Sequence, residues 1–318
     1  PIGARDISLV GFTLFNYGLW IYWIGQSLQR CFRNPHATVF SKGQSYSLVA
    51  CLEVIILGFS VQAEINGYWW NDFFSNLAML SILNVVILFG LMALLSPQRQ
   101  ALQDWARYSQ VSEKRSGKIS QQTRRRGDAG TRRNEIPPHI SFTRYNKLQT
   151  RQRTLVQDLV WGEKSPAVVA MAINLAIATT PTLLWILLQS VENLDKTKIL
   201  FGAAFFASWM MIYASLVQLI LMMRTPKRVI WAAGTVAATT CLPVTVLGVL
   251  GIFPDENPTL WLFSTFPWVG LEYGTTTTVW MALLGQGIVL VLLNLQLRRQ
   301  LKQVGESASK ALLSMDNR

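Results

Sequence analysis

The stretch that decides the fold is TTTVWMALLGQGIVLVLLNLQLRRQLK, residues 276–302. Residues 276–297 carry no charge, and they supply the roughly 20 residues that cross about 30 Å of hydrocarbon at 1.5 Å per residue. Arg298, Arg299 and Lys302 follow at once. Basic residues beside a spanning helix mark the cytoplasmic side, because they are retained there during insertion. Six more apolar runs predict further spans, at residues 7–28, 46–65, 73–95, 167–191, 199–223 and 229–253.

The basic residues support one topology for these seven spans. Nearly all of the 29 Lys and Arg residues fall in four stretches that would share one side of a membrane, namely 30–45, 96–166, 224–228 and 298–318. The intervening loops are acidic or nearly neutral. The sequence therefore predicts an all-α, polytopic protein of the bacterial plasma (inner) membrane, with residue 1 outside and a cytoplasmic carboxy terminus.

The expected organisation has four parts: spans in 1–96, a basic cytoplasmic loop in 97–166, spans in 167–297 and a cytoplasmic tail in 298–318. An outside amino terminus without a signal peptide suggests the carboxy-terminal part of a longer membrane protein. Within the loop, 109–138 is rich in Arg, Gly and Pro and is expected to be disordered, whereas 145–160 has the spacing of an amphipathic surface helix. Residues 257–273, aromatic but broken by prolines, predict an outer re-entrant or interfacial segment.

Composition argues against several classes of function. The net charge of +12 would suggest nucleic acid in a soluble chain, but here it sets orientation and favours anionic lipid. The two histidines, His36 and His139, lie far apart, so neither a metal site nor a cofactor is expected. There is no phosphate-binding loop, so any ATP hydrolysis would take place on another subunit.

Three residues inside the spans are candidates for a transport path. Glu53 is the one ionisable side chain well inside a span, where a carboxylate costs about 2.5–3.5 kcal/mol, so it should face protein or water. It is either a substrate-path or proton-coupled carboxylate, or a structural partner of a polar group on a neighbouring helix. Pro181 and Pro243 each interrupt a span shortly after a pair of threonines. Such a break can line a transport path, act as a hinge or be a static kink.

Two stretches beside the membrane carry a resemblance. CFRNP continuing to SKGQSY, in residues 31–46, and DLVWGEKSP, residues 158–166, resemble segments of large cyanobacterial membrane proteins described as ABC-2-type transporter permeases. The resemblance implies a pore-forming subunit that moves a substrate when a separate ATPase subunit hydrolyses ATP. That ATPase is expected to dock beside the helix ends, through residues that include Arg33, Lys42, Gln44, Trp161 and Glu163.

Two other classes of function remain. A membrane-embedded enzyme would need clustered acids, histidines or a phosphate-binding motif at one interface, and none is apparent. A non-transporting scaffold or assembly protein could instead use the basic loop to hold partners or anionic lipid. The sequence does not separate this scaffold from the permease, and either could form homo- or hetero-oligomers.

Overall fold

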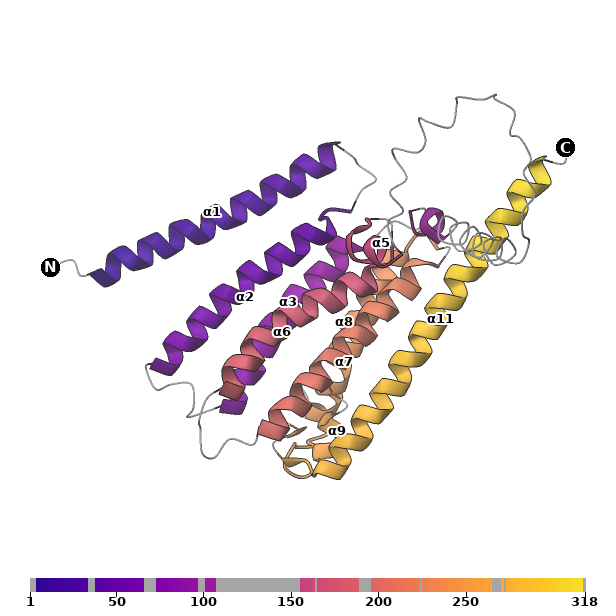
Figure 1. Cartoon of the computed structure of the whole chain (residues 1–318). Helices are drawn as coiled ribbons and strands as arrows, with labels where there is room; N and C mark the ends of the chain where they lie inside the picture. The colour runs from indigo at the N-terminus through magenta and orange to yellow at the C-terminus, as the bar shows by residue number, and fades with distance from the viewer. Residues whose placement is uncertain are drawn as a thin grey trace, which may run out of the picture.

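The computed structural model describes residues 4–33, 38–65, 73–96, 101–106, 155–163, 165–188, 196–223, 225–262, 264, 270–271 and 273–316. These residues contain helices and no strand (Figure 1). The helices are α1 (Ala4–Arg33), α2 (Lys42–Ile65), α3 (Phe73–Leu95), α5 (Leu155–Trp161), α6 (Ala167–Leu188), α7 (Lys196–Leu221), α8 (Arg228–Val249), α9 (Pro258–Leu262) and α11 (Thr276–Asp316).

Within the described residues, five helices are long and apolar enough to cross a membrane. They lie in α2, α6, α7, α8 and α11, so five of the seven predicted spans have this property, and the protein has the helices of a membrane protein. The predicted first and third spans are also helical, as α1 and α3, but the apolar part of α3, Met79–Leu95, is shorter. Seven membrane crossings therefore remain a prediction.

Successive long helices alternate in direction along the bundle (Figure 1). The carboxy-terminal ends of α1, α3, α7 and α11 lie at the same end as the first turns of α2, α6 and α8. These helix ends flank the four basic stretches of the sequence, so we call this end the basic end. The small helix α9 lies at the opposite end. The arrangement agrees with the alternation inferred from charge, while the side of the membrane on which the basic end lies stays a prediction.

Helix α7 is the centre of the bundle because it packs against α3, α6, α8 and α11. Its side chains Phe205, Met210 and Tyr213 are almost wholly buried. One core cluster joins α2, α3, α6 and α7 towards the basic end, and a second joins α6, α7, α9 and α11 towards the other. A polar contact adds to this packing, because Ser208 of α7 hydrogen-bonds to Gln286 of α11.

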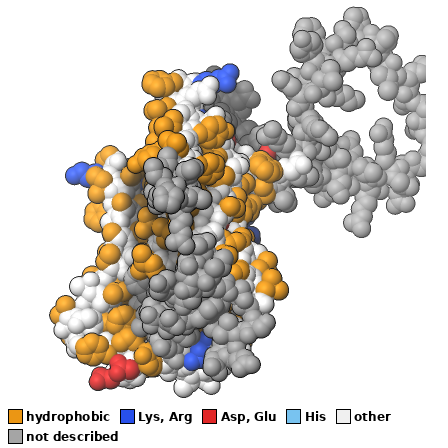
Figure 2. All heavy atoms as spheres, turned by 90° about the vertical axis from the view of Figure 1, so that its left-hand side faces the viewer, with side chains coloured by type: hydrophobic (Ala, Val, Ile, Leu, Met, Phe, Trp, Pro, Cys, Tyr) orange, Lys and Arg blue, Asp and Glu red, His pale blue; other side chains and the backbone are white. Residues whose placement is uncertain are grey.

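The outer helices expose apolar side chains to their surroundings. On α8, Ile230 and Val249 are exposed, and on α1 so are Leu14 and Ile21. Figure 2 shows hydrophobic side chains spread over most of the described part of one face. Water would make such a surface costly, whereas lipid tails solvate it, so the exposed apolar side chains suit a bundle surrounded by a bilayer.

Several predicted boundaries can be compared with the helices. The span predicted at 276–297 continues as helix to Asp316, so α11 includes most of the predicted tail. Residues 101–106 are helical, with Leu102 and Ala106 buried. In the segment predicted at 257–273, α9 contacts α11, and Trp261 Nε1 donates a hydrogen bond to the carbonyl of Ile252. The predicted disordered stretch and most of the predicted amphipathic helix lie outside the described residues.

Candidate functional site

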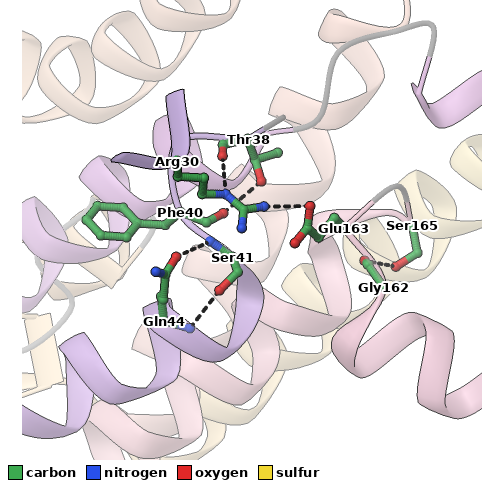
Figure 3. A network of polar contacts seen from close by, with 8 residues as sticks. All are labelled: Arg30, Thr38, Phe40, Ser41, Gln44, Gly162, Glu163 and Ser165. Atoms are coloured by element: carbon green, nitrogen blue, oxygen red, sulfur yellow. Dashed lines mark hydrogen bonds and ion pairs between the residues drawn. The ribbon is translucent and has the colours of Figure 1, made fainter. Parts of the chain in front are cut away.

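The first turn of α2 is fixed by a reciprocal pair of hydrogen bonds. Ser41 Oγ accepts a bond from the Gln44 backbone N–H at 3.1 Å, and Gln44 Oε1 accepts one from the Ser41 backbone N–H at 2.9 Å (Figure 3). This is a capping box, which satisfies two backbone donors that the start of a helix otherwise leaves free. The spacing Ser-x-x-Gln just before an apolar run is its sequence signature, so this cap could have been found from the sequence.

Lys42 lies directly after that cap and is only 3% exposed. Its Nζ donates to the carbonyl of Leu159 at 2.6 Å, to Ser165 Oγ at 2.6 Å and to the carbonyl of Pro166 at 3.2 Å. An ammonium group has three donors, so these partners satisfy it fully. The carbonyl of Leu159 belongs to the last turn of α5, where partial negative charge favours a cation.

Ser165 completes the attachment between α2 and the turn that follows α5. Besides accepting from Lys42, its hydroxyl lies 2.7 Å from the carbonyl oxygen of Asp158 and 2.8 Å from that of Gly162, so it donates to this pair of acceptors. Asn174 Nδ2 of α6 then donates at 3.0 Å to Ser45 Oγ, which itself donates to the carbonyl of Lys42. Polar side chains thus tie α2 to both α5 and α6.

Aromatic contacts cover the same attachment. Tyr46 Oη donates to the carbonyl of Val160 at 2.8 Å, and its ring meets that of Trp161 edge to face at a centroid separation of 5.6 Å. Gly43 leaves room for the Trp161 ring, because a Cβ built there would lie 3.1 Å from it, a close contact that a small shift of the ring would relieve. Trp161 nevertheless remains 59% exposed, so part of its ring is free for an outside partner or lipid.

Helix α1 joins this region through Arg30. The Arg30 guanidinium lies 2.5 Å from a carboxylate oxygen of Glu163, and Arg30 Nε donates to the carbonyl of Thr38 at 2.8 Å (Figure 3). The Gln44 amide also donates to Gln26 Oε1 of α1 at 3.4 Å. Residues 38–46, 158–163 and 165–166 therefore form one interconnected unit between α1, α2, α5 and α6, which we call the junction.

The junction brings together the two stretches proposed separately as ATPase-docking segments. Of the predicted docking residues, Lys42 and Gln44 use their side chains in hydrogen bonds within the protein, whereas the side chains of Glu163 and Arg33 are exposed. Ser41, Ser45, Ser165 and Asn174 were not singled out as site residues. Apart from the Ser-x-x-Gln spacing, no local signal marks them, because their partners lie in other helices.

The predicted path residue Glu53 lies deeper in the bundle, on α2. It is 2% exposed and so faces protein, while its role in a transport path stays a prediction. Neither of its carboxylate oxygens has a hydrogen-bond partner among the described residues. Also within the described part of the chain, no three His, Cys, Asp or Glu side chains lie close enough to hold a metal ion.

A cavity of about 50 Å³ lies between α3, α6 and α7, next to the turn of α6 that contains Pro181. Asn84 and Thr182 line it, and Asn84 Oδ1 and Thr182 Oγ1 have no hydrogen-bond partner among the described residues. Most of its lining is apolar, but its volume is sufficient for water, and these polar atoms are possible partners for it. Pro243 does not line it; that residue lies in α8, an outer helix that packs against α7.

Comparisons with known proteins do not assign the chain to a family. No protein-family model, no curated protein and no solved structure matches the chain.

Proposed function

We propose that this protein is a membrane-spanning permease subunit driven by a separate ATPase subunit, and that the junction is where the ATPase docks. The observation that carries the proposal is the buried tie from Lys42 to the turn after α5, at Leu159 and Ser165. A coupling element must transmit movement to several spans at once. A unit joined by internal hydrogen bonds to α1, α2, α5 and α6 can do so, whereas a flexible loop cannot.

Exposed side chains in the junction and at the adjoining end of α1 define the docking face. Glu163 is 45% exposed while paired with Arg30, and Trp161 presents an open ring beside it. Arg33 is exposed one turn beyond Arg30, at the end of α1. A carboxylate, an aromatic ring and a guanidinium group suit a polar partner with a small apolar contact. The buried ammonium of Lys42 supports this face from within, because its donors are all used inside the protein.

Crosslinking within the native complex tests the docking site. Single cysteines replace Glu163 and Arg33 in a background where Cys31, Cys51 and Cys241 are serine, and the full-length protein is purified with the products of its neighbouring genes. We expect an ATPase to co-purify and to crosslink at both positions. Lys227, also exposed at the basic end but at the start of α8, provides the matched control position.

Three results would count against the proposal in different ways. Crosslinks at Lys227→Cys but at neither test position would move the docking site to another part of the basic end. If an ATPase co-purifies but no transported molecule stimulates its ATP hydrolysis, the proposed transport function is wrong. If no ATPase associates and no transport is measured, the scaffold function replaces the permease.

A further inference from the structure

Glu53 lies on the buried side of α2, in line with Val49, Ile56 and Ser60. That side packs against α6 and α3. Ser60 satisfies its own hydroxyl by donating to the carbonyl of Ile56. The two carboxylate oxygens of Glu53 stay without a hydrogen-bond partner among the described residues. Glu53 is therefore enclosed by protein but not paired with any side chain that the structure describes.

The helices that surround Glu53 offer no counter-charge. Neither α3 nor α6 contains an ionisable residue. On α5, Asp158 lies at the basic end, near Lys42. Lys42 is itself eleven residues before Glu53, about 16 Å along the helix axis, and its donors are already used. Arg30 of α1 is paired with Glu163 at that same end.

The ionisable groups of α2 that lie closest to Glu53 along the helix supply no positive charge to pair with it. Tyr46 donates its hydroxyl to the carbonyl of Val160, and Cys51 is a half-buried free thiol. Tyr46 donates its hydroxyl proton in this bond and therefore supplies no charge. An ionised Glu53 would therefore be an unpaired charge shielded from water, which costs far more than adding one proton to a carboxylate.

We propose that Glu53 is a proton-binding site and is a neutral carboxylic acid in this conformation. A metal cation is a poorer occupant, because such ions require several oxygen ligands around them, and no described side chain shares a hydrogen bond with these oxygens. A proton needs one oxygen and no further ligand. The use of this proton in transport rests on the proposed permease function, whereas its presence on Glu53 does not.

The depth of Glu53 indicates how its proton would exchange. The contact of Ser45 with Asn174 aligns α2 with α6, and both helices run from the basic end (Figure 1). Eight residues further on, about 12 Å along each axis, Glu53 lies level with Thr182, beside the break at Pro181. The cavity lined by Asn84 and Thr182 is at this depth, but Glu53 is not among its lining residues. A proton that passes from Glu53 to this cavity has to cross the α2–α6 contact, so exchange by this route requires that contact to open.

Infrared spectroscopy of the purified full-length chain at pH 7, in a maltoside detergent that contributes no ester carbonyl band, provides the test. A neutral carboxylic acid has a C=O stretch well separated from the carboxylate bands, so the two states are distinguished directly. We expect the wild type minus Glu53→Gln difference to show the loss of an acid C=O band. Glu163→Gln, the matched control, removes an ion-paired, half-exposed carboxylate and should instead show the loss of carboxylate bands.

The outcomes separate clearly. Loss of a carboxylate band in Glu53→Gln, whether from a bare carboxylate or one that holds a metal cation, overturns the proposal. If Glu53→Gln does not fold, the wild type is compared with Glu53→Asp between about pH 7 and pH 8, where ordinary carboxyls are ionised. An acid band that shifts in Glu53→Asp supports the proposal, and the absence of an acid band in the wild type refutes it. This measurement needs no ATPase, so it can succeed where the permease function fails.

Discussion

Replacing Lys42 by methionine should strongly destabilise the junction. Methionine keeps the apolar stem of the side chain but removes three hydrogen bonds from a charged donor, which contribute about 1.5–3 kcal/mol each. Those contributions do not add in full, because the cost of burying the cation disappears with it and Ser165 keeps its carbonyl partners. The carbonyl of Leu159 loses a charged partner. We expect a net loss of about 3 kcal/mol in the free energy of unfolding, roughly a factor of 100–200 in the folded-to-unfolded ratio.

Equilibrium unfolding in mixed micelles, with sodium dodecyl sulfate as the denaturant, measures this loss. Lys227→Met is the matched control, since Lys227 is exposed at the start of α8 and should change stability by less than about 0.5 kcal/mol. Lys42→Arg tests the geometry, because a planar guanidinium does not fit acceptors arranged around an ammonium group; it should stay destabilised although the charge is kept. The reasoning would be refuted if Lys42→Met were as stable as the wild type within about 0.5 kcal/mol.

Three other predictions test the junction and the topology. Gly162→Ala should lower the free energy of unfolding by about 1–3 kcal/mol, because its Cβ would meet the backbone carbonyl of Asp158, one turn earlier in α5. Gly43→Ala should be nearly neutral, because the exposed Trp161 ring can shift. Thermal unfolding compares the two variants, and equal losses of stability would contradict this account. A double-mutant cycle of Arg30→Gln with Glu163→Gln should give a coupling energy of about 1 kcal/mol or less, because the Glu163 carboxylate is half exposed. A much larger coupling energy would contradict this and show that the ion pair holds α1 in place. In sealed right-side-out vesicles, trypsin should leave residues 124–133 intact, and cleavage without permeabilisation would reverse the predicted orientation.

Local sequence was sufficient for the helices themselves. The run predicted at 73–95 is α3, and the run predicted from residue 167 begins with the first residue of α6. Such runs are decided by neighbouring residues, because a helix satisfies its backbone hydrogen bonds internally and the bilayer requires about 20 apolar side chains in succession. Apolar length predicts the extent of a span but not of the helix that contains it: the span was predicted to end at residue 297, and α11 continues as helix through the predicted tail to Asp316.

The candidate site was only partly accessible from the sequence. Glu53 was recognised because its residue type is costly in any apolar run. The junction was not recognised as one unit, since its central bond joins Lys42 to Leu159 across 117 residues. Lys42 therefore looked like an exposed docking residue, when its ammonium group is enclosed and fully bonded.

The sequence by itself determined which segments are apolar helices and which ends of them are basic, because both depend on residues close together in the chain. The tertiary structure alone decided which polar side chains meet. A lysine, a serine or an asparagine can bond to water, lipid or protein, and only packing assigns its partner. That is why the same charge at Lys42 and Lys227 has opposite surroundings, one enclosed between α2, α5 and α6 and the other open at the start of α8.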